Sequence, residues 1–225
     1  MSFEHKIRAS FQLAHKPSFN VSMFKNPVLL ILVFIIYLLA PASVAATNNQ
    51  KLRSLIERKD PRKALDLALS IEDRHTSDFE FYFLKGRAYQ DLKLNLESLE
   101  AYSQSIALNR TNYKAYINRG LVKGALGNLR ASLIDLKKAV QLNKNSKKAF
   151  LNLGVTYAAQ NDPKRAIKAF DSALIIDPNF PEALRNRGIT YHHLSKKKNS
   201  CADWSKYIEL KNDDEVSDWH EEICK

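Results

Sequence analysis

Histidine and cysteine are the side chains of this sequence best suited to metal binding or nucleophilic chemistry. His192 and His193 are adjacent, and both cysteines, Cys201 and Cys224, lie in the last fifth of the chain. Adjacent histidines point in different directions on a helix, and a zinc site needs further ligands at compatible spacing. Only Cys201 is close enough in sequence to join the two histidines. We therefore expect no metal site and no cofactor.

Motifs for catalysis are missing from the sequence. It contains no glycine-rich phosphate loop, no nucleophile elbow and no paired-histidine motif of a zinc protease. An arrangement of Cys and His suited to nucleophilic attack is not visible either. The sequence predicts a protein that is not an enzyme and has no small-molecule substrate.

Asparagine and lysine, in contrast, recur at a fixed interval. Asn118, Asn152 and Asn186 are separated by 34 residues, and Lys114 and Lys148 precede the first two by one helical turn. A side-chain amide both donates to and accepts from an extended peptide backbone. The lysines favour an acidic segment.

The interval of 34 residues runs through most of the chain. It separates four of the six glycines, which are Gly86, Gly120, Gly154 and Gly188. A small residue follows each glycine by 12 positions and a large one by 16. The small residues are Ser98, Ser132, Ala166 and Ser200, and the large ones are Tyr102, Leu136, Phe170 and Trp204. Two apolar-periodic segments separated by a turn, as in 153–159 and 166–174, predict two helices per unit.

This pattern resembles the tetratricopeptide repeat family over about residues 49–212. The segment from Lys147 to Pro178 matches the family pattern best, and Lys123 and Tyr207 are the clearest departures from it. Its matching residues are Phe150, Gly154, Tyr157, Ala166, Phe170, Ala173 and Pro178. The resemblance implies an all-α fold, a right-handed α-solenoid of about five helix–turn–helix units with a C-terminal capping helix.

The repeat frame divides the chain into a leader, one divergent unit, four complete units and a cap. The divergent unit keeps Asp60, Pro61 and Ala64 in register but has Leu52 in place of the glycine and Ala68 in place of the large residue. The expected boundaries are 1–46 for the leader, 49–78 for the divergent unit, 79–112, 113–146, 147–180 and 181–212 for the complete units, and 213–225 for the cap.

The resemblance implies that the first helix of each unit lines a concave groove that holds a segment of another protein. The residues it places there are Arg87, Lys114, Asn118, Lys148, Asn152 and Asn186. Members that clamp heat-shock chaperone tails carry Lys and Asn at two positions where this chain has neither, so the ligand is expected to bind differently. The leading hypothesis is a scaffold for complex assembly, of bacterial or organellar type. The alternatives are a structural envelope protein without a peptide ligand, and asparagines that are merely a family habit.

Two further motifs have structural interpretations. In the repeat frame Cys201 replaces Leu or Ile, so it is either a small core residue or, if the domain is exported, the partner of Cys224 in a disulfide. Arg119 and Arg187 each precede a repeat glycine. We expect their stems to pack between helices and their guanidinium groups to reach solvent.

The leader contains an apolar segment that we expect to direct the chain to a membrane, with a buried core helix as the alternative. Residues 27–40 carry no charge, and small residues continue to 46. A basic leader, an apolar stretch and a small-residue end are typical of a cleaved signal peptide, but the 20 residues 27–46 also suffice for a retained membrane anchor. Both remain open, as does a start of translation at Met23. We expect localisation across or in a membrane, in the periplasm or an organelle lumen or on the membrane.

The formal charge of +11, from 35 Lys and Arg against 24 Asp and Glu, has two interpretations. Interspersed charges are typical of a solvated helical surface, whereas the excess also attracts acidic partners. Exposed aromatics interleaved with the basic residues, which nucleic-acid binding favours, are missing, so we expect no nucleic-acid partner.

Overall fold

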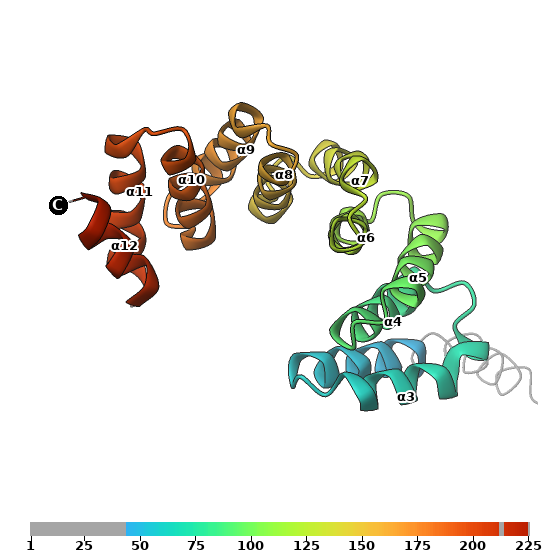
Figure 1. Cartoon of the computed structure of the whole chain (residues 1–225). Coiled ribbons are helices and arrows are strands. Elements are labelled where there is room, and N and C mark those ends of the chain that lie inside the picture. The colour runs from blue at the N-terminus through green and yellow to red at the C-terminus, as the bar shows by residue number, and fades with distance from the viewer. Residues whose placement is uncertain (1–43, 212–213, 225) are drawn as a thin grey trace, which may run out of the picture. The chain divides into compact units, whose positions relative to one another are not determined.

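The computed structural model describes residues 44–211 and 214–224, and these residues form helices joined by short turns (Figure 1). A helical segment, 44–57, is followed by α3 (Pro61–Ile71) and a short 3-10 helix, η2 (Glu72–Arg74). Four helix pairs follow, which we call repeats 1 to 4. They are α4 (Phe79–Asp91) with α5 (Asn95–Leu108), α6 (Tyr113–Ala125) with α7 (Leu129–Leu142), α8 (Lys147–Ala159) with α9 (Pro163–Ile176), and α10 (Pro181–His193) with α11 (Lys197–Leu210). The last helix is α12 (Asp214–Cys224).

The predicted all-α architecture of successive helix pairs is confirmed. Nearly all of the predicted leader, including residues 27–43 of its apolar segment, lies outside the described residues. None of the described helices combines the length and the apolar composition that crossing a bilayer requires.

The turns inside the helix pairs share one backbone conformation. A residue with positive φ recurs every 34 positions, and the five residues are Lys59, Lys93, Gly127, Asn161 and Ser195. The second helix then starts on a capping group in several pairs, for example where Asp162 accepts from the backbone N–H of Arg165 and Pro163 opens α9. Because Lys59 obeys the same interval, the divergent pair has the turn geometry of the complete repeats.

Each pair is held together by a large side chain that lies on a glycine. A Cβ atom added at Gly154 would lie 2.5 Å from Phe170 Cε1, and one added at Gly188 would lie 2.4 Å from Trp204 Nε1. Phe170 and Trp204 are almost completely buried. The missing side chain therefore lets the second helix approach the first and place its largest residue in the core.

The repeats stack through both helices, but the first helices lie closer together. α6 contacts α4 and α8, and α8 contacts α10, whereas no comparable contact joins the second helices of successive repeats among the described residues. The first helices therefore form the inner side of this stack.

The last repeat is closed by α12, as predicted for a cap. Val216 is fully buried against α11, and the Arg185 guanidinium lies 5.2 Å from the ring centroid of Trp219. Arg185 Nη2 also lies 3.1 Å from Glu215 Oε2. Cys201 and Cys224 form a disulfide in the structure, with their Cα atoms 5.6 Å apart.

Glycine positions of different packing give a matched test of this arrangement. We expect Gly154→Ala to destabilise the protein by about 1–3 kcal/mol, because the new methyl group collides with the buried Phe170 ring. Gly124→Ala is the control, since its Cβ would meet nothing closer than 3.5 Å and alanine favours helix. Urea unfolding followed by circular dichroism measures both. Equal effects would contradict the role of the glycine contact.

The disulfide is tested by replacing both cysteines with serine. The bond joins residues 23 positions apart, so the double variant should lose about 3 kcal/mol of unfolding free energy through greater freedom of the unfolded chain. Guanidinium unfolding with and without dithiothreitol measures the loss. Reductant should lower the midpoint of the wild-type protein and leave that of the variant unchanged. A wild-type midpoint that resists reductant and equals that of the variant would be inconsistent with a stabilising bond.

Candidate functional site

The six residues predicted for partner binding lie on the first helices of the four repeats. Arg87 is on α4, Lys114 and Asn118 are on α6, Lys148 and Asn152 are on α8, and Asn186 is on α10. The two lysines are exposed and the other four residues are half-buried. Because the first helices form the inner side of the stack, we call these six residues together the inner face.

Asn118 belongs to a polar bridge between α4 and α6. Its Nδ2 atom donates to the hydroxyl of Tyr102 across 3.1 Å, and that hydroxyl donates to Gln90 Oε1 across 2.7 Å. Tyr102 comes from α5 and is fully buried, and its two hydrogen bonds show that its side chain reaches between the two first helices. Burial raises the pKa of the Tyr102 phenol, while the hydrogen bond from Asn118 and the charge of Arg87 act in the opposite direction. The hydroxyl is therefore a neutral donor at physiological pH.

The other asparagines have different surroundings. Asn186 Nδ2 donates to the backbone carbonyl of Glu182 on its own helix across 2.6 Å. The side-chain amide of Asn152 has no hydrogen bond to any of the described residues, although its backbone carbonyl accepts from Thr156. The three asparagines therefore occupy equivalent positions but form different hydrogen bonds. Asn152 is the one whose side-chain amide is most available to a ligand.

Sequence reasoning treated Tyr102 only as a core residue. The signal for its second role is its hydroxyl, because Leu136, Phe170 and Trp204 have none at the equivalent position. A phenol placed where other repeats bury only hydrocarbon or indole needs a partner for its O–H.

The two arginines that precede repeat glycines lie in paired clamps. Arg119 donates from Nε and Nη2 to both carboxylate oxygens of Asp135, each across 2.8 Å, and from Nη1 to Ser103 Oγ across 3.0 Å. Arg187 contacts Asp203 through Nε at 2.8 Å and Nη2 at 2.6 Å, and reaches Asp171 through Nη1 at 2.6 Å. Each clamp ties both helices of one repeat to the second helix of the preceding repeat.

The expectation that these guanidinium groups reach solvent is wrong. The side chains of Arg119 and Arg187 are only 18% and 21% exposed, and Asp135 and Asp203 are almost fully buried, whereas Asp171 is 43% exposed. The hydrogen bonds to Asp203 raise the pKa of Arg187, so its cation persists at every ordinary pH. A buried carboxylate needs such a partner, and Lys123 supplies a second one to Asp135 across 2.7 Å. A signal was present in sequence, since an aspartate follows each arginine by 16 residues.

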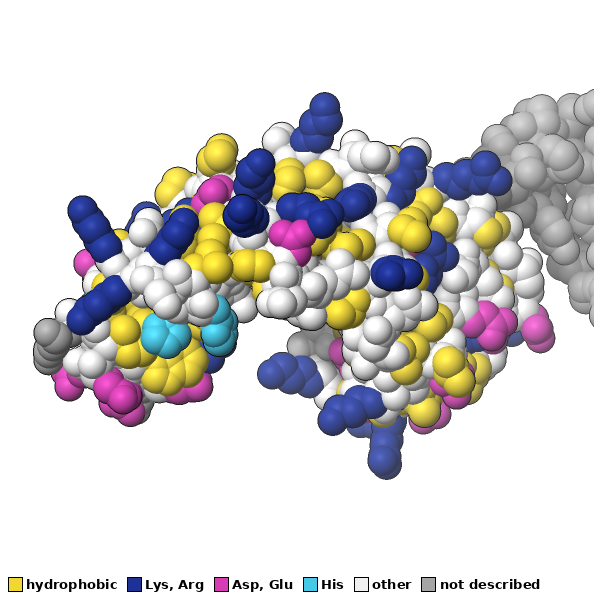
Figure 2. All heavy atoms as spheres, turned by 45° about the horizontal axis from the view of Figure 1, so that its top comes forward, with side chains coloured by type: hydrophobic (Ala, Val, Ile, Leu, Met, Phe, Trp, Pro, Cys, Tyr) yellow, Lys and Arg dark blue, Asp and Glu magenta, His cyan; other side chains and the backbone are white. Residues whose placement is uncertain are grey.

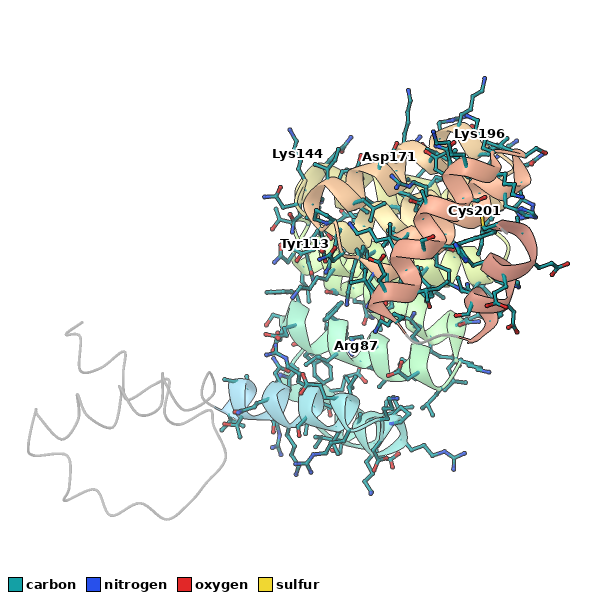
Figure 3. All side chains as sticks on the ribbon, turned by 90° about the vertical axis from the view of Figure 1, so that its left-hand side faces the viewer. Arg87, Tyr113, Lys144, Asp171, Lys196 and Cys201 are labelled. Atoms are coloured by element: carbon teal, nitrogen blue, oxygen red, sulfur yellow. A yellow bond between two sulfur atoms is a disulfide. The ribbon has the colours of Figure 1, made fainter. Side chains whose placement is uncertain are left out.

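Basic side chains are widespread on the surface. Lys and Arg are scattered over the face shown in Figure 2, and two of the turns carry the exposed lysines Lys144 and Lys196, which are labelled in Figure 3. The excess of cations seen in composition is therefore a property of the folded surface.

Family models described as tetratricopeptide repeat match residues 79–112, 113–146 and 148–180. PilF of Pseudomonas aeruginosa is a similar solved structure, with a TM-score of 0.71 and 14% identity over 76% of this chain and 78% of that one. PilW, described as a widely conserved type IV pilus biogenesis factor, has a TM-score of 0.69 and 20% identity over 74% and 77%. YrrB, described as a TPR protein with an unusual peptide-binding site, has a TM-score of 0.62 and 19% identity over 78% and 91%. No curated protein matches this chain.

The clamp in repeat 2 can be tested against the residues that repeat 3 has in its place. Arg119→Leu alone should cost about 3–5 kcal/mol of unfolding free energy, because Asp135 loses most of its bonds while staying buried. Arg119→Leu with Asp135→Ala should cost less than the single change, since no buried charge is left behind. Urea unfolding gives both values, with Arg110→Leu, at an exposed turn residue, as the control. If the double variant has a lower unfolding free energy than the single variant, the clamp contributes more to stability than the neutralisation of a buried charge.

Proposed function

Because this chain belongs to the tetratricopeptide repeat family, with three matched repeats in succession over residues 79–180, we propose that its inner face binds an extended, acidic segment of a partner protein. The observation that carries the proposal is the recurrence of donors on successive first helices. Lys114 and Lys148 are exposed there, and the amide of Asn152 is available for hydrogen bonds.

The chemistry of the inner face fits a peptide backbone better than a small molecule. The amides lie one repeat apart, so an extended segment meets them in turn, and each can donate to a carbonyl and accept from an N–H. Each such bond contributes about 0.5–1.5 kcal/mol net, and an exposed lysine–carboxylate pair about 0–1 kcal/mol. Binding therefore depends on several repeats acting together, which is the interaction mode of a scaffold.

The Tyr102 bridge holds one part of this face in place before a partner arrives. Asn118 is oriented by the Tyr102 hydroxyl, which is itself anchored on Gln90. A donor that is already ordered loses less conformational entropy on binding than a free side chain does. YrrB, a fold relative, is described as having a peptide-binding site, which supports a peptide ligand for this chain as well.

We also propose that the repeats act beyond or on a membrane, in the assembly of a complex. The apolar residues 27–46 support export or tethering. The disulfide between Cys201 and Cys224 also supports it, because disulfides persist in oxidising compartments. PilW, a fold relative, is described as a pilus biogenesis factor, which fits an assembly role. Scaffolds of this family are generally not enzymes, and we propose no catalytic role.

Site-specific photo-crosslinking tests the inner face in the native cell. A photoreactive residue at Lys114 or Lys148 should give an adduct with one partner, whereas the same residue at the exposed Leu96 on α5 should not. Asn118→Ala with Asn152→Ala should reduce that adduct at least about fivefold, the effect of losing about 1 kcal/mol of binding free energy. Adducts are identified by mass spectrometry.

The control variant is Asn145→Ala, which removes an exposed amide from a turn outside the inner face. Its adduct yield should equal that of the wild-type protein, and circular dichroism should show the same helix content in all variants. An unchanged yield in the double variant, or an equally strong adduct from Leu96, would refute binding at the inner face.

A further inference from the structure

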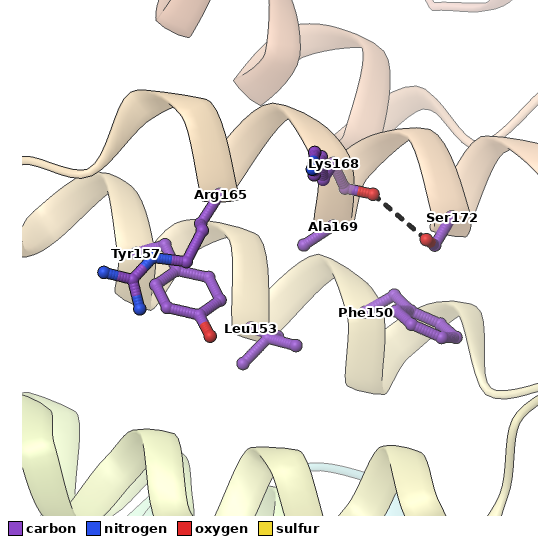
Figure 4. Close-up of a pocket in the computed structure, with 7 residues that line it drawn as sticks. All are labelled: Phe150, Leu153, Tyr157, Arg165, Lys168, Ala169 and Ser172. Carbon is purple, nitrogen blue, oxygen red and sulfur yellow. Dashed lines mark hydrogen bonds between the residues drawn. The ribbon is translucent and has the colours of Figure 1, made fainter.

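A hollow of about 230 Å³ opens between α8 and α9 of repeat 3 (Figure 4). It shares no residue with the set that we assign to the inner face. The residues that line it are Phe150, Leu153, Tyr157, Arg165, Lys168, Ala169 and Ser172. In Figure 4 the Arg165 side chain extends along Tyr157, and the Leu153 and Phe150 side chains lie on the α8 side of the hollow.

The hollow exists because repeat 3 lacks the clamp of its neighbours. In repeats 2 and 4 the equivalent space holds an arginine, an aspartate and a polar residue of the preceding second helix. Moving the positions of Arg119, Asp135 and Ser103 forward by 34 leads to Leu153, Ala169 and Lys137, and by 34 more to Arg187, Asp203 and Asp171. Leucine and alanine occupy less space than an arginine–aspartate pair, so repeat 3 keeps an opening where the others are filled.

The floor of this hollow is apolar and its edge is cationic. Leu153, Tyr157 and Ala169 are buried at 9%, 7% and 5% exposure. The Arg165 guanidinium lies 5.1 Å from the centroid of the Tyr157 ring. Lys137 Nζ lies 5.8 Å from the same ring on the other repeat's side. An anionic group at this edge would meet cations already gathered around one aromatic ring.

Not all of the cations around the hollow form ion pairs within the protein. Arg165 pairs with Asp162 across 2.5 Å. Lys137 and Lys168 make no ion pair with any of the described residues, and Lys168 is exposed beside the opening. The lining therefore carries one uncompensated cation, Lys168, and Lys137 adds a second beside the Tyr157 ring, so the site favours a ligand with carboxylates.

The hollow is open to solvent, so its volume describes a surface depression and not an enclosed pocket. Pockets for drug-sized molecules enclose roughly 300–1,000 Å³. A space of about 230 Å³ is smaller, and suits one large apolar side chain of a polypeptide. The chain's own acidic helix, α12, is already bound to α11 through its disulfide and buried Val216, and is not a free ligand.

We propose that this hollow docks an acidic segment of a partner protein. One phenylalanine or leucine side chain of the segment contacts Leu153, Tyr157 and Ala169, and flanking carboxylates bind Lys137 and Lys168. The same combination closes the C-terminal repeat, where Glu215 of an acidic helix pairs with Arg185 and the guanidinium lies over Trp219. The hollow shares no lining residue with the inner face, so it is a second, distinct binding surface in this proposal.

Fluorescence anisotropy with labelled heptapeptides tests the proposal on the full chain in mild detergent. The probe has a central phenylalanine with three acidic residues on each side. It should bind about tenfold more tightly than the same peptide with a central alanine, because the aromatic ring is buried on binding. A peptide with lysines in place of the acids should not bind. If the phenylalanine and alanine probes bind equally, or neither binds, the proposal is wrong.

Variants locate the site. Lys137→Ser, Leu153→Arg and Ala169→Asp together install the residues of repeat 2 and should fill the hollow, which lowers probe affinity at least about tenfold. If the triple variant has lost helix content, the single change Ala169→Leu fills the space without charge and should have the same effect. The matched control Lys164→Glu, on an exposed residue of α9 that does not line the hollow, should change affinity by less than about twofold.

Two further measurements separate this proposal from its alternatives. Asn118→Ala with Asn152→Ala should leave probe binding unchanged, because those residues belong to the inner face. A loss of binding in that double variant would assign the probe to the inner face and overturn the proposal. Concentration-dependent dimerisation that Ala169→Leu abolishes would show that a second copy occupies the hollow, and would overturn the assignment to a partner protein.

Discussion

The contact between a glycine of the first helix and the largest residue of the second is the constraint on which the structure depends. At Gly86, Gly120, Gly154 and Gly188 an added Cβ would approach the facing side chain to 3.0 Å or less. This contact sets the distance between the helices of a pair and turns Tyr102, Leu136, Phe170 or Trp204 into a core residue. One pair buries only one side of its helices, so stacking and an end cap follow from the same contact. The cap is then needed only where the stack stops, which is where α12 and the disulfide are found.

On this common frame the repeats differ in how they join their predecessors. Repeats 2 and 4 use charge, through Arg119 with Asp135 and Arg187 with Asp203, whereas repeat 3 has Leu153 and Ala169 at the same places. A buried carboxylate contributes little net stability, but it fixes one geometry because any other leaves it unpaired. Leucine and alanine constrain the geometry of the joint less, and they leave space between the helices. The clamps therefore fix the joints between repeats 1 and 2 and between repeats 3 and 4, whereas the joint between repeats 2 and 3, beside the opening, has no clamp.

The sequence predicted the frame well because the frame is periodic. Glycines 34 residues apart, with small and large residues in step, sufficed to predict helix pairs and their turns, and even the divergent pair shares its turn conformation through Lys59. The side-chain hydrogen bonds between helices were not predictable in this way. Whether Asn186 bonds its own helix while Asn118 bonds Tyr102 depends on rotamers and on the neighbouring helix, which a repeat pattern does not encode. The clamps were not predicted for the same reason. The arginines and aspartates were present in the sequence, but the repeat pattern did not indicate that they pair across helices. Export, tethering and the peptide ligand stay predictions.

A frame that uses few positions leaves the others free to change. In the repeats the glycine, the small residue and the large residue set the backbone, while the residues of the clamp position vary from one repeat to the next. Substitutions at Lys148 or Lys168 therefore alter charge at the surface without disturbing the contact that holds a pair together. Stability and recognition are carried by different side chains of the same helices. Such a separation lets one chain present a polar surface on its first helices and an apolar opening edged by cations on repeat 3, each adjustable without refolding the other.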